Sequence, residues 1–98
     1  MKIFHNEEIY IKTDNFSDSI FKENTMFFDI ETTGFSPVKA IVYMIGCARR
    51  IKNRIVIDQY FAESVDDEAA VIEAFAGSLS GCSTIISFNG CRFLIYHF

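Results

Sequence analysis

The sequence has no excess of basic charge, and this absence limits how the protein could bind nucleic acid. Nine Lys and Arg residues stand against thirteen Asp and Glu residues, which gives a net charge of −4 at pH 7. Domains that hold nucleic acid by charge alone are usually basic, so the composition argues against that class. A carboxylate site that first recruits divalent metal ions stays compatible with it, because the bound metals then attract phosphate.

Cysteines and long apolar runs are also scarce. Cys47, Cys82 and Cys91 form neither a CxxC pair nor a zinc-ligand spacing. An odd number of cysteines without a secretory leader predicts a reducing compartment. The N-terminal residues turn acidic at once, and no apolar run reaches the roughly 18 residues that cross a bilayer. We therefore expect a soluble, cytoplasmic protein with no membrane partner; its oligomeric state is not indicated.

What the sequence does contain is the composition of one small globular domain. Half of its 98 residues are apolar and 22% are charged, which excludes a disordered tail and leaves room for a single core. Residues 1–24 are weakly patterned, and we describe them as a lead segment in which alternation over residues 8–13 predicts a short strand. Residues 25–98 are expected to form the domain proper.

The pattern of the later residues predicts a sheet. Strands are expected over residues 25–31, 40–48 and 55–61, and the short connections between them imply an antiparallel meander. The run over residues 40–48 is almost continuously apolar, which is typical of a strand covered on both faces.

A helix is expected after these strands. It should begin at Ser64, with Asp67 completing a capping box, and end at Gly81. A further strand over residues 83–88 would then lie parallel within the same sheet after a right-handed crossover, which makes the fold class α/β. The predicted apolar stripe of the helix consists of Ala69, Ile72, Phe75, Ala76 and Leu79.

The first predicted strand carries two carboxylates at alternate positions. Residues i and i+2 of a strand point to the same face roughly 7 Å apart, so Asp29 and Glu31 would project together. Two neighbouring carboxylates on an inner strand repel each other unless a cation is bound between them. Mg²⁺ is the natural cation, because it takes oxygen ligands from one or two carboxylates and completes its shell with substrate phosphate. An exposed strand face is the alternative interpretation of such a pair.

The context of this pair resembles a known nuclease family. The string FDIETTG over residues 28–34 resembles the first motif of the DEDD-type 3′→5′ exonucleases, which have an RNase H-like mixed sheet. Residues 43–46, 60–63 and 86–90 resemble the following strands of one bacterial branch, the YprB-like RNase H-like domains. The resemblance implies a hydrolase that uses two Mg²⁺ or Mn²⁺ ions and acts on single-stranded 3′ ends of nucleic acid.

The resemblance also implies roles for individual residues. Asp29 and Glu31 would be the catalytic metal ligands. The backbone at Thr33 and Gly34 would approach the terminal nucleotide, because glycine leaves room for close contact. The implied substrate-binding residues are Thr32, Thr33, Gly34 and Asn89.

The resemblance fails near residue 94. The family pattern places an Asp there, as its third carboxylate, but this chain has Leu94, and a Leu side chain cannot bind Mg²⁺. The last five residues can be encoded TTG-ATA-TAC-CAT-TTT, and a shifted frame of these bases spells the expected Asp-Ile-Pro-Phe. We therefore expect residues 94–98 to be a frameshifted tail on a domain that lacks its C-terminal part. The DNA sequence downstream of the codon for Phe93 tests this.

With two of the family's four carboxylates, the chain is expected to show little or no nuclease activity. Two alternatives remain open: a non-catalytic nucleic-acid-binding or interaction module, and a non-functional gene fragment.

His5 and His97 are expected to be surface residues rather than ligands. The basic cluster could contact phosphate, but a solvated hairpin tip is the simpler interpretation; it consists of Arg49, Arg50, Lys52 and Arg54.

Overall fold

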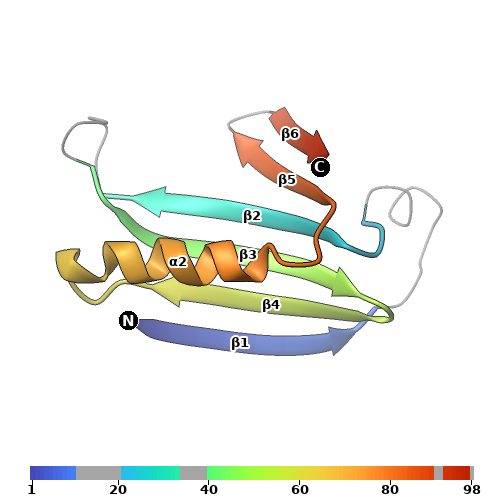
Figure 1. Cartoon of the computed structure of the whole chain (residues 1–98), viewed down its shortest axis with the longest axis horizontal. Helices are drawn as coiled ribbons and strands as arrows, with labels where there is room; N and C mark the ends of the chain where they lie inside the picture. Colours follow the sequence, from blue (N-terminus) through green and yellow to red (C-terminus); the bar gives the residue numbers. More distant parts are fainter. Residues whose placement is uncertain (11–20, 34–39, 90–91, 98) are drawn as a thin grey trace.

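The fold is seen in a computed structural model that describes residues 1–10, 21–33, 40–89 and 92–97, with the backbone alone at 88, 89, 92–94, 96 and 97. One sheet contains all six strands, in the order β1-β4-β3-β2-β5-β6 (Figure 1). The strands are β1 (Lys2–Ile9), β2 (Thr25–Thr32), β3 (Val42–Ile51), β4 (Arg54–Phe61), β5 (Thr84–Asn89) and β6 (Arg92–His97). A 3₁₀ turn, η1 (Val65–Asp67), leads into the helix α2 (Glu68–Ser78).

The predicted meander and crossover are confirmed. β2, β3 and β4 pair antiparallel in sequence order, and β5 returns after α2 to pair parallel with β2. This is a mixed α/β sheet, as the sequence predicts. The turn between β3 and β4 is tighter than predicted: only Lys52 and Asn53 separate the strands, and Lys52 adopts a left-handed φ of 55°.

Two strands lie outside the predicted set. β1 covers Lys2–Ile9 rather than residues 8–13, of which 11–13 lie outside the described chain, and it pairs antiparallel with β4. Part of the lead segment therefore belongs to the same sheet as the domain. β6 pairs antiparallel with β5 and places Leu94 opposite Ser87.

The helix α2 lies across β3 and β4 on one face of the sheet (Figure 1). It begins later than expected, because η1 precedes it, and Ser64 makes no side-chain cap. Asp67 instead accepts the N–H of Glu63 at 3.0 Å, and Glu68 accepts the N–H of Val42 at 2.6 Å, which fixes the start of α2 against β3.

The apolar stripe of α2 is rotated from the predicted one. Val71 is fully buried, whereas Ile72 is 45% exposed, and Ala69 and Ala76 are exposed as well. Phe75 and Leu79 were predicted correctly. The stripe that packs on the sheet consists of Val71, Ala74, Phe75, Ser78 and Leu79.

The core lies between α2 and the sheet. Its buried side chains are Met26, Ile45, Cys47, Tyr60 and Val71. Phe28 packs beside Phe75 with 5.2 Å between the ring centroids. Within the described chain α2 covers one face of β3, and no described helix or strand covers the other, so the predicted cover on both faces is seen on one of them. No described helix is long and apolar enough to span a bilayer.

Candidate metal site on the open face of the sheet

The two carboxylates of the candidate site belong to the strand that joins the two halves of the sheet. β2 lies between β3 and β5, with antiparallel pairing on one side and parallel pairing on the other. Met26 and Phe28 pack toward α2. Side chains alternate along a strand, so Asp29 and Glu31 project from the opposite, open face.

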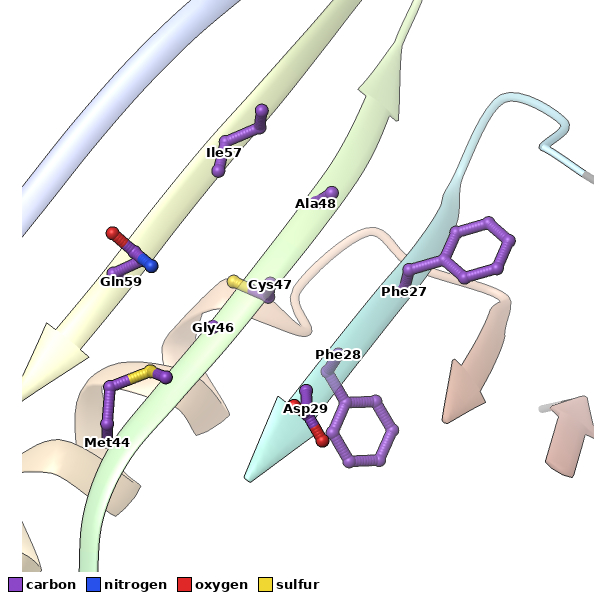
Figure 2. A pocket seen from close by; sticks show the side chains of 9 residues that line it. All are labelled: Phe27, Phe28, Asp29, Met44, Gly46, Cys47, Ala48, Ile57 and Gln59. Atoms are coloured by element: carbon purple, nitrogen blue, oxygen red, sulfur yellow. The ribbon is translucent and has the colours of Figure 1, made fainter. Parts of the chain in front are cut away.

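A shallow groove adjoins Asp29 on this open face, with a volume of about 380 Å³ (Figure 2). Gly46 lies directly opposite Asp29 in the β2–β3 register. A Cβ at Gly46 would come no closer than 3.7 Å to Met44, so packing does not require a glycine at this position. The glycine leaves the backbone of β3 bare beside the Asp29 carboxylate. The other lining residues are Phe27, Phe28, Met44, Cys47, Ala48, Ile57 and Gln59.

Neither carboxylate is neutralised by a basic side chain. Asp29 is exposed and Glu31 is half-buried, and no described Lys, Arg or His lies within ion-pairing distance of either one. Neighbouring carboxylates in this position repel each other. Across residues 1–10, 21–33, 40–89 and 92–97, no third His, Cys, Asp or Glu completes a metal-binding group with them.

The predicted substrate-binding residues lie beside this pair where they are described. The β2–β3 register shifts between Glu31 and Thr32. The Thr33 hydroxyl accepts the N–H of Ile41 at 3.1 Å, so this side chain closes the end of the β2–β3 pair. Asn89 is the last residue of β5, described by its backbone only, and Gly34 lies outside the described residues.

Sequence analysis missed a second polar cluster, on the helix-covered face. Asp58 is only 5% exposed, although its neighbours in sequence gave no sign of this. One carboxylate oxygen lies 2.5 Å from His5 Nδ1, and the other accepts from Arg49 Nη2 at 3.3 Å. The cluster ties β1, β4 and β3 together.

The basic cluster is divided between the two faces, which corrects the prediction of a solvated hairpin tip. Arg49 pairs with Asp58 and also reaches the carbonyl of Ser78. Arg50 stacks on Tyr10 with 4.2 Å from the guanidinium carbon to the ring centroid. Lys52 and Arg54 are exposed as expected.

His5 is exposed, as predicted, and its side chain also takes part in the Asp58 cluster. The hydrogen bond to Asp58 raises the pKa of the imidazole above its ordinary 6.5. Because the pKa is higher in the folded state, the interaction of protonated His5 with Asp58 stabilises the fold fully below the unfolded-state pKa. This stabilisation is lost as pH rises through the folded-state pKa. We expect the difference in urea midpoint between the wild type and His5→Gln to shrink as pH rises above about 6.5. A pH-independent difference would contradict this ion pair.

A comparison with protein families shows the family of this chain, and one curated protein resembles it. The profile of the RNase_H superfamily matches residues 26–97, which is most of the chain. The uncharacterized protein YprB of Bacillus subtilis (strain 168) is 27% identical to this chain over 73 residues. The match covers 74% of this chain and 17% of that protein. The chain matches no solved structure significantly.

The chain therefore belongs to the RNase H superfamily, and its domain is RNase H-like. The match begins at the strand that carries Asp29 and Glu31 and extends through β6. The chain spans a small part of the relative it matches, so the activity of the longer protein is not carried over as a finding.

Proposed function

We propose that this domain is built for metal-dependent hydrolysis of nucleic-acid phosphodiesters, of the 3′→5′ exonuclease type. Asp29 and Glu31 are the proposed metal ligands. One observation carries the proposal: two carboxylates share the open face of β2, beside a groove and without a described cationic partner. An arrangement that repels itself when empty is stabilised when a divalent cation binds.

The donor set fits one hydrated ion better than a pair of ions. Mg²⁺ is commonly bound through one or two carboxylates, with waters and substrate phosphates filling its other positions. Asp29 and Glu31 supply that minimum, and the described residues add no third acidic ligand. The second ion implied by the family would need a carboxylate where the chain has Leu94. The proposed site therefore holds Mg²⁺ or Mn²⁺ weakly.

Each part of the site has a separate task in this proposal. A bound divalent ion supplies activation of water and neutralisation of phosphate charge. Asp29 and Glu31 orient the ion from a rigid central strand. The backbone at Thr32, Thr33 and Gly34 adjoins the terminal nucleotide of a single strand, with Asn89 on the neighbouring strand. The groove beside Asp29 offers an apolar surface to the nucleotide.

The free thiols of Cys47 and Cys82 support a reducing, cytoplasmic location.

A thermal-shift experiment tests the metal site. If about 10 mM Mg²⁺ is ten times the dissociation constant, binding stabilises the fold by about 1.4 kcal/mol and raises Tm by several degrees. Asp29→Asn should abolish this rise while leaving stability in EDTA unchanged or slightly increased, because a repulsion is removed. Asp66→Asn, at an exposed carboxylate outside the site, is the matched control and should keep the rise. A metal-induced rise that survives in Asp29→Asn would exclude the proposed site.

A further inference from the structure

The outer edge of β1 is a surface that the proposed function does not use. β1 ends the sheet on its side, and no described strand pairs with its outer edge (Figure 1). An unpaired edge strand presents free N–H and C=O groups, which proteins usually protect with prolines, bulges or inward-pointing charges. β1 contains no proline, and its register with β4 runs without a shift over Lys2–Ile9.

The hydrogen bonds of the β1–β4 ladder show which backbone groups face outward. Tyr10 donates its N–H to the carbonyl of Asn53 at 2.7 Å. Bonded and non-bonded pairs alternate along an antiparallel ladder, so the even-numbered residues of β1 bond to β4. The odd-numbered residues direct their N–H and C=O groups to the outer edge; they are Ile3, His5, Glu7 and Ile9.

Large apolar side chains are exposed on the same strand. Ile3 is 55% exposed, Phe4 is 57% exposed and Ile9 is 70% exposed. The main contacts of α2 within the described chain are with β3 and β4. Ile3 and Ile9 lie on the α2 side of β1 and Phe4 lies on the open side, on a strand that also carries Lys2, Glu7 and Glu8. Exposed apolar side chains on an edge strand without a proline or a bulge are typical of an interaction site.

We propose that β1 is a self-association edge, at which two copies of the chain pair their β1 strands antiparallel with Asn6 opposite Asn6. Outward groups can bond only if odd-numbered residues face odd-numbered residues. With Asn6 at the centre, Ile3 of each copy lies opposite Ile9 of the other. His5 of each copy likewise lies opposite Glu7 of the other. Among the odd-numbered positions, apolar therefore faces apolar and base faces acid, while on the other face of the strand Phe4 lies opposite Glu8.

The two neighbouring registers match less well. Centring the pair on His5 places the two imidazoles opposite each other and sets Ile3 against Glu7. Centring it on Glu7 sets the two carboxylates opposite each other. Like charges directly opposite are destabilising in an antiparallel pair, whereas opposite charges and apolar pairs are stabilising. The side-chain pattern of β1 therefore selects the Asn6-centred register.

This pairing would join two six-stranded sheets into one continuous sheet. The two-fold axis of an antiparallel edge pair stands perpendicular to the sheet, so both copies of α2 lie on one face. Both Asp29–Glu31 pairs then lie on the other face. The dimer leaves both proposed metal sites open, and self-association can be tested independently of metal binding.

Sedimentation equilibrium of the 98-residue chain tests the edge. We expect a monomer–dimer equilibrium that Glu7→Pro weakens at least about tenfold. Proline removes an outward N–H that the β1–β4 ladder does not use, and edge strands tolerate it there. Glu7→Ala is the matched control, because it loses the same contact with Arg54 but keeps the N–H. A monomer up to about 1 mM, or a dimer as strong in Glu7→Pro as in Glu7→Ala, would overturn the proposal.

Disulfide trapping tests the register without relying on the proline variant. Directly opposed, non-bonded pairs place Cα atoms about 4.5 Å apart, within the range of a disulfide. Asn6→Cys should therefore cross-link two copies under mild oxidation, and mass spectrometry should locate the bond at the substituted position. Glu8→Cys is the control and should not cross-link to itself, because it lies opposite Phe4. Self-linking at position 8 instead of position 6 would refute the Asn6-centred register.

Discussion

Asp58→Ala is expected to lower the free energy of unfolding by about 3–5 kcal/mol, the usual result of removing one partner of a buried ion pair. The carboxylate contacts both His5 and Arg49 beneath α2. Without it, the Arg49 side chain, which is 21% exposed, keeps its charge in a mostly buried position with no counter-charge. Small domains are stable by only about 5–15 kcal/mol, so this single change should remove a large share.

Urea unfolding followed by far-UV circular dichroism measures this loss. Glu73→Ala removes an exposed carboxylate from α2 and should change stability by less than about 0.5 kcal/mol. The double variant Arg49→Met, Asp58→Leu should be more stable than Asp58→Ala alone, because it removes the buried charge as well as its partner. Equal losses in the single and double variants would show that the charge of Arg49 is not the cause.

The pairing of β2, β3, β4 and β5 could be predicted because it depends on local patterns. Short connections require antiparallel neighbours, and the helix after β4 requires a crossover. The face of α2 was harder, because Val71 and Ile72 are adjacent and both apolar. Only contact with the sheet decides between them, and it buries Val71 and leaves Ile72 exposed.

Contacts distant in sequence explain the two features that were missed. Among the described strands, β1 pairs with β4 alone, and the main contacts of α2 are with β3 and β4. The sequence of β1 accordingly shows only weak alternation of apolar and polar residues. Asp58 looks like an ordinary polar position between Ile57 and Gln59. Its burial depends on His5, which is 53 residues away, and on the register that brings β1 to β4.

The shared face of Asp29 and Glu31 was the easier feature to predict. Its two carboxylates lie two residues apart, so one strand places both of them without any tertiary contact. Asn89 comes from a different strand, and Gly34 from a segment outside the described residues. How these residues complete a substrate site therefore stays a prediction.

The purified chain is expected to shorten a 5′-labelled single-stranded oligonucleotide no faster than its Asp29→Ala variant, in Mg²⁺ or in Mn²⁺. In two-metal hydrolysis, the two ions stabilise both the attacking and the leaving oxygen of the phosphodiester. They supply much of the rate enhancement over the uncatalysed reaction, which in enzymes commonly reaches about 10⁶-fold or more. Asp29 and Glu31 supply one weak ion site in the proposal, and Leu94 cannot supply the ligand that a second ion needs. Denaturing gel electrophoresis of the reaction products measures the rate.

Two further experiments distinguish weak metal binding from weak nucleic-acid binding as the cause of inactivity. The first uses a variant in which residues 94–97 are replaced. In the pairing seen here, position 94 lies on the face of Phe28 rather than that of Asp29. Replacing residues 94–97 with Asp-Ile-Pro-Phe supplies the carboxylate of the family pattern and also a proline that interrupts the pairing of β6 with β5. We expect the new carboxylate to reach the open face once this pairing is lost, and so to lower the Mg²⁺ midpoint of the thermal shift. The same replacement combined with Asp29→Asn is its control and should show no such change. Oligonucleotide binding by the unaltered chain in EDTA, without cleavage in Mg²⁺, would favour a non-catalytic binding module. Robust cleavage that Asp29→Ala abolishes would instead show that two carboxylates suffice, and the argument from Leu94 would be wrong.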